Sequence, residues 1–221
     1  MEIGVFGKGK TGREVIKLLG AKYVFDSQNL PDSKIPLDAL IVFIPPKAFK
    51  ENLPLLLTLN CPLIIGTTGI EWTAQLRQEV QSQNRLWIHG SNFSLGMLLI
   101  RKAFLEMKAS MSILNGPEIT ITETHHIDKK DAPSGTALLW NEWLGSDNEI
   151  KSIRESDTIG LHEAKIMTEM EKITITHQAT DRKLFAEGAL WCAKAVIQLN
   201  FESGLYSFEN IVDRYLKEKN V

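Results

Sequence analysis

The chain has 221 residues, of which 43% are hydrophobic, and a formal net charge of −2. This length is sufficient for two modest domains with real hydrophobic cores, while the near-neutral charge gives no basic field that would attract nucleic acid. No apolar run is long enough for a signal peptide or a membrane-spanning helix. The two cysteines, Cys61 and Cys192, suit core positions in a reducing cytoplasm better than a disulfide or a catalytic thiol. We therefore expect a cytoplasmic protein without nucleic-acid or membrane partners.

The chain opens with a buried strand over residues 2–6, a glycine-rich turn over 7–12 and a helix over 13–19. Glycine at G-x-G-x-x-G spacing permits a tight turn, a close approach of backbone to a pyrophosphate, and close packing of helix on strand. The same turn also occurs in α/β domains that bind no nucleotide. We predict that its six residues bind a dinucleotide cofactor: Gly7, Lys8, Gly9, Lys10, Thr11 and Gly12.

A second apolar strand over residues 23–25 leads into Asp26, nineteen residues after Gly7. An acidic side chain at this distance from the glycine turn can accept hydrogen bonds from a ribose. No arginine follows Asp26, so the 2′-phosphate of NADPH would meet repulsion, which only Lys8 and Lys10 could soften. NADH is therefore the favoured cofactor, and NADPH stays possible.

Three further strands are predicted over residues 37–44, 63–65 and 86–88, with helices over 49–59 and up to residue 83 between them. Strands that alternate with helices predict a parallel sheet with right-handed crossovers, here a Rossmann-type α/β domain. Ligands of such sheets bind at the carboxyl ends of the strands, although tripeptides of this kind are more often plain turns. The cofactor-binding residues predicted in these loops are Phe43, Gly66, Thr67, Thr68, Ser91, Asn92 and Phe93.

The alternation of strands and helices ends after Asn92. The next segments are a helix over residues 95–107, a strand from Ile119, a helix to Leu144, and two antiparallel strands within residues 162–179. This order predicts an α+β domain for substrate binding and oligomerisation over residues 94–189. Helices over 188–199 and 205–216 return to the dinucleotide domain, which we expect to comprise residues 1–93 and 190–221.

Residues 123–137, E-T-H-H-I-D-K-K-D-A-P-S-G-T-A, carry most of the functional information. Strand alternation places Glu123 and His125 on one face and His126 on the other. Ser134 follows a proline and can cap a helix, whose first amides are then free to bind an anion. A histidine is a natural proton donor beside such an anion site.

Lysine near this helix start adds a charge-assisted hydrogen bond to an anion. Adjacent histidines could also bind zinc, but they lie on opposite faces and lack His-Glu-x-x-His or paired-cysteine spacing, so we predict no metal site. A solvated turn is the other common role of a charge run such as 128–131. The predicted catalytic residues are His125 and Lys129, and the predicted substrate-binding residues are His126, Lys129, Ser134, Gly135 and Thr136.

With these residues in view, the chain resembles the 4-hydroxy-tetrahydrodipicolinate reductases over nearly its whole length. The pattern H-H-x-x-K-x-D-x-P-S-G-T of residues 125–136 is highly specific for that family, and the glycine turn and residues 66–69 and 91–96 also match. Further matching positions are Arg154, Gly160, His162, His177, Arg182, Phe185, Gly188 and Ala189.

The resemblance implies hydride transfer from a reduced nicotinamide to a small cyclic, unsaturated dicarboxylate in the diaminopimelate route to lysine. It implies that His125 supplies the proton, that Lys129 assists with the substrate, and that the amides of Gly135 and Thr136 hold a carboxylate. His126 can neutralise further charge. Family members are usually homotetramers built through the substrate-domain sheet, for which the strands of residues 162–179 are available.

Three features depart from the family pattern. Residues 42–46, V-F-I-P-P, lack the hydroxyl of the usual Asp-Phe-Thr-x-Pro, the segment between Leu144 and Ile153 is short enough to trim a loop, and the glycine turn is one residue shorter than in some relatives. Two other functions stay open at this point. One is an NAD-linked dehydrogenase of another small dicarboxylate such as aspartate, and the other is a non-catalytic NAD-binding protein.

Overall fold

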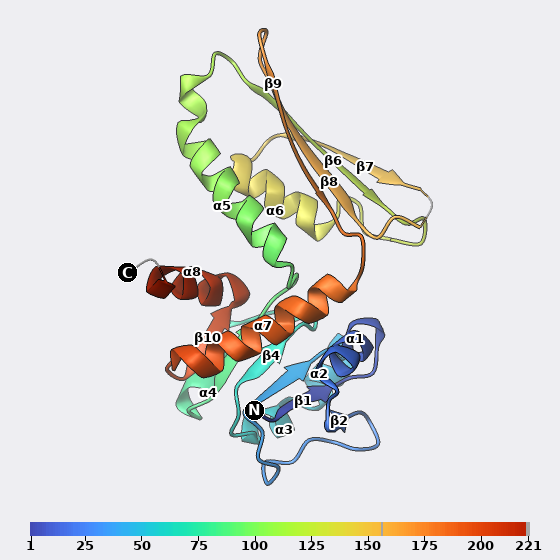
Figure 1. Cartoon of the computed structure of the whole chain (residues 1–221), viewed down its shortest axis with the longest axis vertical. Coiled ribbons are helices and arrows are strands. Elements are labelled where there is room, and N and C mark those ends of the chain that lie inside the picture. The colour runs from blue at the N-terminus through green and yellow to red at the C-terminus, as the bar shows by residue number, and fades with distance from the viewer. Residues whose placement is uncertain (156, 220–221) are drawn as a thin grey trace. The chain divides into compact units, whose positions relative to one another are not determined.

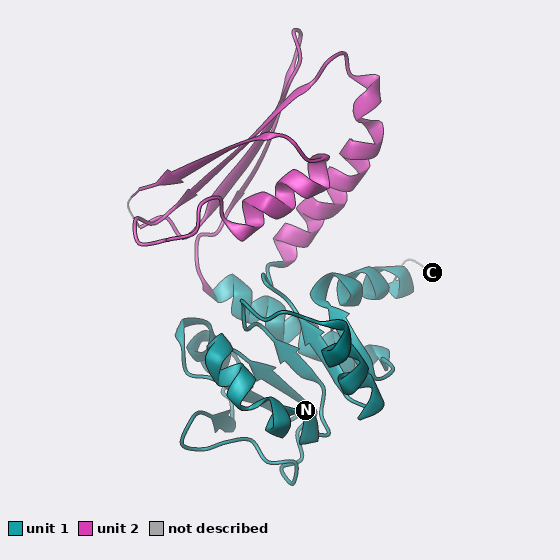
Figure 2. Cartoon of the chain, turned by 180° about the vertical axis from the view of Figure 1, so that it is seen from behind, with its two compact units in different colours: residues 1–94, 183–221 teal, residues 95–182 magenta. Residues whose placement is uncertain are grey.

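The computed structural model describes residues 1–155 and 157–219 and divides the chain into two compact units (Figure 2). Unit 1 comprises Met1–Ser94 and Lys183–Val221, and unit 2 comprises Leu95–Arg182. The second boundary lies at Lys183 because α7 (Lys183–Leu199) is one continuous helix. The predicted boundary at residue 190 falls inside that helix.

Unit 1 contains a six-stranded parallel sheet of order β10-β5-β4-β3-β1-β2 (Figure 1). Every residue of β1, β3 and β4 is buried, as expected for a parallel sheet covered on both faces. This architecture confirms the predicted Rossmann-type fold. Its strands are β1 (Ile3–Phe6), β2 (Tyr23–Phe25), β3 (Ala39–Val42), β4 (Leu63–Ile65), β5 (Leu86–His89) and β10 (Gly204–Ser207).

The helices of unit 1 correct two sequence predictions. The single helix predicted over 49–59 is two short helices, because Pro54 lacks the amide that a helix interior requires and fits only in the first turn of the second. The helix predicted over 205–216 begins at Phe208, because Leu205 lies in β10, beside β5. The helices are α1 (Lys10–Leu19), α2 (Pro46–Glu51), α3 (Leu53–Thr58), α4 (Ala74–Ser82), α7 and α8 (Phe208–Lys219).

Unit 2 has a mixed four-stranded sheet of order β7-β6-β8-β9, with α5 and α6 together on one side of it (Figure 2). Strands β8 and β9 are antiparallel, as predicted. Trp140 and Phe104 pack edge to face in its core, with ring centroids 4.8 Å apart. The elements are α5 (Leu95–Ser110), the 3₁₀ turn η1 (Met111–Ile113), β6 (Glu118–His125), α6 (Gly135–Leu144), β7 (Glu149–Arg154), β8 (Leu161–Met167) and β9 (Lys172–Gln178).

Strand β7 was not predicted from the sequence. Residues 144–153 were interpreted as a trimmed loop, but 149–154 form an edge strand parallel to β6. The segment E-I-K-S-I-R is mostly exposed and rich in charge, so it lacks the apolar alternation by which a half-buried strand is recognised. Within the described part of the chain, no helix combines the length and the apolar character needed to cross a membrane.

Candidate active site

The glycine turn of unit 1 leaves no room for side chains at two positions. A Cβ on Gly7, whose φ is +116°, would lie 2.1 Å from the carbonyl oxygen of Phe43, and a Cβ on Gly12 would lie 2.1 Å from that of Gly7. A Cβ on Gly9 would meet nothing within 4 Å, so the backbone there faces open space. Tight packing at the first and third glycines and free space at the second fit a pyrophosphate at the start of α1.

Asp26 lies directly after β2 and makes three contacts with its neighbours. Its Oδ2 accepts a hydrogen bond from Lys8 at 2.6 Å, and its Oδ1 accepts from the amides of Gln28 at 2.8 Å and Asn29 at 3.0 Å. These donors, Lys8 first, lower the pKa of Asp26. The carboxylate is therefore ionised and already oriented where a ribose acceptor was predicted.

The loops after β3, β4 and β5 lie at one edge of the sheet because all strands are parallel. Phe43 lies against Gly66, where a Cβ would come within 2.0 Å of its ring, and its ring meets that of Phe93 at 6.0 Å. Thr67 is buried and donates its hydroxyl to the carbonyl of Ile44 at 2.9 Å. The structure thus brings these predicted residues together, while Thr68 and Ser91 are exposed nearby in the chain.

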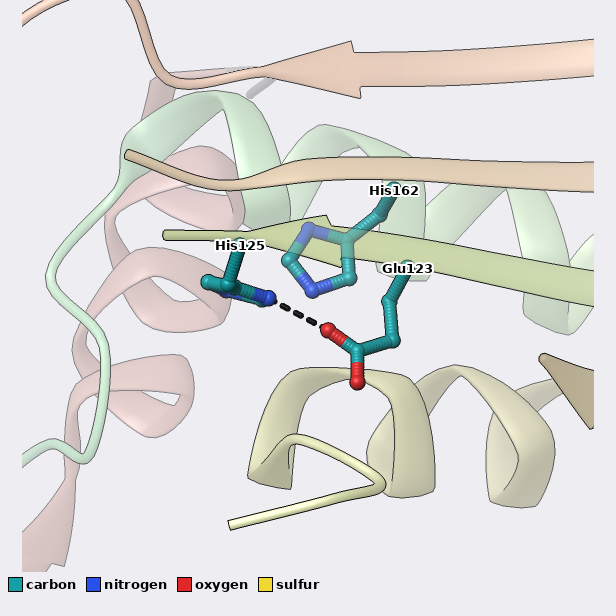
Figure 3. A group of neighbouring side chains, drawn as sticks. All are labelled: Glu123, His125 and His162. Carbon is teal, nitrogen blue, oxygen red and sulfur yellow. Dashed lines mark hydrogen bonds and ion pairs between the residues drawn. The ribbon is translucent and has the colours of Figure 1, made fainter. Parts of the chain in front are cut away.

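In unit 2, His125 and Glu123 project from the same face of β6, as strand alternation predicted. Nδ1 of His125 contacts Oε2 of Glu123, and the ring of His162 from β8 lies edge-on to that of His125, with centroids 5.1 Å apart (Figure 3). All three side chains are buried, Glu123 completely. The register of β6 and β8 pairs Glu123 with His162 directly, which explains the convergence.

Further groups donate hydrogen bonds to the Glu123 carboxylate. Oε1 accepts a hydrogen bond from Nη2 of Arg154 at 2.8 Å and from the amide of Ser134 at 3.2 Å. Burial alone would raise the pKa of Glu123, but the hydrogen bonds from Arg154, Ser152 and His125 outweigh it and the pKa is lowered. Glu123 is therefore a buried anion held by several donors.

The two buried histidines are weaker bases than free imidazole. Burial lowers the pKa of His125, with Lys129 and Arg154 adding to the effect, while Glu123 opposes it. Burial also lowers the pKa of His162, to about 4, and the neighbouring His125 contributes. Both rings are therefore neutral at neutral pH, and His125 needs a further anion besides Glu123 to hold a second proton.

The helix α6 begins as predicted. Ser134 is its N-cap and accepts a hydrogen bond from the amide of Ala137 at 3.2 Å, and its hydroxyl also contacts Nε2 of His162 at 3.2 Å. Gly135 and Thr136 are the first two helical residues, whose amides have no intrahelical acceptor. A Cβ on Gly135 would meet nothing within 4 Å, so this helix start is open to a ligand.

Lys129 lies on the loop between β6 and α6. Its Nζ is 2.8 Å from both carboxylate oxygens of Asp131, and this contact is the main cause of a lowered pKa of Asp131. Lys129 is partly buried and lowers the pKa of His125, which places its charge near that ring. His126, on the opposite face of the strand, is half-buried and takes no part in the Glu123 cluster.

Glu123, His125 and His162 each offer one atom of a type that binds metals, and these atoms lie within 4.8 Å of one another. The guanidinium of Arg154, 2.8 Å from Glu123, places a fixed positive charge where a cation would have to bind. A metal ion bound to the same carboxylate would lie close to this guanidinium, and like charges a few ångströms apart repel in a buried site. The charge of Arg154 therefore disfavours a metal ion in this cluster.

Comparisons with known proteins agree with the resemblance noted from the sequence. The family model described as "Dihydrodipicolinate reductase, C-terminus" matches residues 96–212. A 4-hydroxy-tetrahydrodipicolinate reductase of Thermosipho africanus is 32% identical over 96% of this chain and 98% of its own length. The chain belongs to the dihydrodipicolinate reductase family.

Further relatives extend this assignment. A 4-hydroxy-tetrahydrodipicolinate reductase of Xanthomonas axonopodis is 36% identical over 72% of this chain and 67% of its own length. A dipicolinate-bound dihydrodipicolinate reductase from Paenisporosarcina superposes with a TM-score of 0.73 at 22% identity, over 95% of this chain and 98% of that one. The likeness to the Paenisporosarcina structure shows that this chain has the same fold as that protein.

Three members of the buried cluster received no functional role from the residues alone. Glu123 was placed only on a strand face, and Arg154 and His162 were noted only as positions that match the reductase family. Arg154 lies at the end of the unpredicted strand β7, so nothing in the sequence placed it opposite His125. The signal that pointed to Arg154 and His162 was the family pattern.

Proposed function

We propose that the protein reduces 4-hydroxy-tetrahydrodipicolinate to tetrahydrodipicolinate with a reduced nicotinamide dinucleotide. This is the reaction for which its relatives are named. In this reaction the substrate gains a hydride and a proton and loses water. The observation that carries the proposal is the Glu123–His125 pair beside the open start of α6, in a chain of this family. That arrangement combines a proton donor with a carboxylate-binding site.

The substrate is a dianion, and unit 2 offers several groups for its two carboxylates. We assign one carboxylate to the amides of Gly135 and Thr136, where the helix field favours negative charge by about 0.3–1 kcal/mol. Lys129 binds the other, exchanging Asp131 for the substrate. Ser134 acts as the cap that orients these amides, because its own amide and hydroxyl already bond within the protein. His126 neutralises remaining charge.

His125 donates the proton in this proposal. Its pKa is lowered in the free protein, and binding of a dianion nearby raises it, so the ring takes up a proton together with the substrate. General-acid assistance of this kind contributes roughly 10²–10⁴ in rate. Lys129 supports the same step by stabilising negative charge on the substrate.

The dinucleotide-binding residues are assigned to unit 1. When bound, a reduced nicotinamide supplies the hydride. We propose that the glycine turn holds the pyrophosphate, that Asp26 accepts from the ribose, and that the loops with Phe43, Gly66 and Thr67 contact the nicotinamide half. NADH is the favoured form, because Asp26 is an ionised acceptor. Lys8, bound to Asp26, offers the charge that makes NADPH usable.

The decisive experiment is a coupled assay. Purified protein should oxidise NADH when it receives the freshly formed product of dihydrodipicolinate synthase, and not when that product is omitted. Running the assay with NADPH in parallel gives the cofactor preference. Aspartate with NAD is the matched test of the alternative dehydrogenase, for which we expect no turnover. Tight NADH binding without turnover on either substrate would instead favour a non-catalytic binding protein.

We also propose that the protein is a cytoplasmic homotetramer assembled through the sheet of unit 2. Helices α5 and α6 cover one side of that sheet, and β9 lies at its edge with alternate residues exposed (Figure 2). Light scattering coupled to gel filtration measures the assembly directly. A monomer at micromolar concentration would contradict this part of the proposal.

A further inference from the structure

One buried carboxylate connects the separate parts of the candidate substrate site. Glu123 contacts His125 through Oε2, and its Oε1 accepts hydrogen bonds from Arg154 and from the Ser134 amide. These donors come from β6, from the end of β7 and from the start of α6. Since a buried ion without partners is strongly destabilising, these hydrogen bonds are what allows Glu123 to be fully buried.

Arg154 extends this connection to the loop that carries Lys129. Its Nη2 also donates to the carbonyl of Asp131 at 2.6 Å, and its Nε donates to the carbonyl of Lys129 at 3.3 Å. The register of β6 and β7 sets Arg154 directly opposite His125. A guanidinium is a planar group with donors in fixed directions, so one side chain orients Glu123 and the loop together.

The contact with Glu123 also decides which nitrogen of His125 is available. An ionised carboxylate only accepts hydrogen bonds, so Nδ1 carries the proton in this contact and Nε2 is the nitrogen that gains or loses one. Gly160 lies beside Nε2, where a Cβ would come within 3.1 Å of it. A glycine at this position therefore leaves space next to the nitrogen that exchanges its proton.

We propose that Glu123 and Arg154 are a positioning pair for His125. Glu123 fixes the ring with Nδ1 as donor, so that Nε2 is the proton-transfer atom, and Arg154 holds the Glu123 carboxylate in place through Oε1. Neither residue needs to touch the substrate for this role. The inference rests on the proposed function in one respect, namely that His125 is the proton donor.

Glu123 and Arg154 carry opposite charges and therefore have opposite effects on the pKa of His125. The groups that face His125 are Glu123 on its own strand, Arg154 on β7, His162 on β8, and Lys129 on the following loop. Beyond the lowering caused by burial, Glu123 raises the pKa of His125, whereas Lys129 and Arg154 lower it. Glu123→Gln should therefore lower the pKa of His125 further, and Arg154→Gln should raise it.

The direct test is a nitrogen NMR titration of the histidines in the full-length protein, without substrate or dinucleotide. We expect protonated Nδ1 in the wild type, a mixture of tautomers with a lower His125 pKa in Glu123→Gln, and a higher His125 pKa in Arg154→Gln. Glu163→Gln and Lys151→Gln are matched controls. Each removes one charge from a strand next to β6, and that charge forms an ion pair with a residue of its own strand rather than with Glu123 or His125. Both should leave the titration of His125 unchanged.

Turnover supplies a second, separable readout. Both Glu123→Gln and Arg154→Gln should lower kcat about 10²-fold, the lower end of the contribution of a general acid, with KM within about threefold. The control variants should keep wild-type kcat. If the protein proves to have no reductase activity, the proposed function fails, and the NMR titration still decides whether this pair orients His125.

Shifts of the His125 pKa in the same direction in both variants, or no shift in either, would overturn the inference. A single substitution leaves one charge buried and unpaired, and the protein then risks unfolding. The double variant Glu123→Gln/Arg154→Met removes both charges and avoids that state. It should fold, show mixed His125 tautomers and turn over slowly, and wild-type kcat in this variant would contradict the proposal.

Discussion

The candidate sites of the two units are built from different kinds of chemical groups. In unit 1 the site consists mostly of backbone, because glycines 7, 9 and 12 and the carboxyl ends of parallel strands provide both the space and the donors. In unit 2 it consists mainly of side chains from β6, β7 and β8 that meet around Glu123, together with the backbone amides at the start of α6. The first is set by local spacing, and the second by strand register.

This difference predicts how each unit responds to substitution. Removing one member of a buried polar network leaves its partners unsatisfied and changes their pKa values. Removing one side chain at a backbone-built site leaves most of the binding contacts in place. Changes in unit 2 should therefore affect the chemical step and pH dependence, and changes in unit 1 should affect dinucleotide affinity.

The largest effect is expected for His125→Gln. Loss of the proton donor should lower kcat by roughly 10²–10⁴, equivalent to about 2.7–5.5 kcal/mol of barrier, and leave measurable residual turnover. Affinity for NADH, measured by its fluorescence on binding, should stay within about twofold. An equal loss of NADH affinity would contradict the assignment of NADH binding to unit 1, and a circular dichroism spectrum checks that the variant is folded.

The next effect concerns the pH dependence of stability. The pKa of His162 is about 4 in the folded protein and 6.5 when unperturbed. The unfolded chain therefore binds a proton that the folded protein does not, and the free energy of unfolding falls as pH decreases from 6.5 to about 4. A shift of this size corresponds to an effect on the order of 3 kcal/mol.

Urea unfolding at a series of pH values measures this loss. The variant His162→Gln should be less stable at neutral pH, and its stability should decline less between pH 6.5 and 4 than that of the wild type. His125 and His177 also have lowered pKa values, so part of the decline remains. An identical decline in variant and wild type would show that His162 does not titrate as its burial predicts.

A smaller effect is expected for Lys129→Ala. A charge-assisted hydrogen bond typically contributes about 1.5–3 kcal/mol, so kcat/KM for the substrate should fall about tenfold to a hundredfold. NADH affinity should not change. Lys130→Ala is the matched control, because this neighbouring lysine is exposed, and it should behave like wild type. Similar losses in both variants would indicate a general effect of charge rather than a contact made by Lys129.

The sequence was sufficient for the parts of the molecule that local spacing determines. The glycine turn, the strand ends and the Ser134 cap each depend on a few consecutive residues whose backbone requirements are visible in the sequence. The fold class follows from the same local patterns, because alternating strands and helices allow few arrangements other than a parallel sheet.

The sequence was not sufficient for what depends on register. Arg154 meets Glu123 only because β7 pairs in parallel with β6, and β7 lacks the apolar alternation of a half-buried strand. His162 meets Glu123 through antiparallel pairing of β6 and β8, which a shift of one residue would abolish. The helix predicted from residue 205 failed for a similar reason, since Leu205 joins the sheet through a partner far away in the chain.

The smallest effect, and the one that tests unit 1, is expected for Asp26→Ala. Asp26 is partly exposed and shares its carboxylate among Lys8 and two amides, so its loss should lower NADH affinity only about tenfold. NADPH affinity should fall less or rise, because repulsion of the 2′-phosphate is removed at the same time. The substrate KM should not change.

Lys8→Ala is the counterpart that sharpens this prediction. This substitution removes the cation that pairs with Asp26, so it should weaken NADPH binding more than NADH binding. Asp26→Ala should instead weaken NADH binding more than NADPH binding. Calorimetric titration of both dinucleotides into wild type and the two variants separates these effects without any turnover. If Asp26→Ala changed the substrate KM and left both dinucleotide affinities unaltered, Asp26 would not be a cofactor residue, and the assignment of dinucleotide binding to unit 1 would have to rest on the glycine turn.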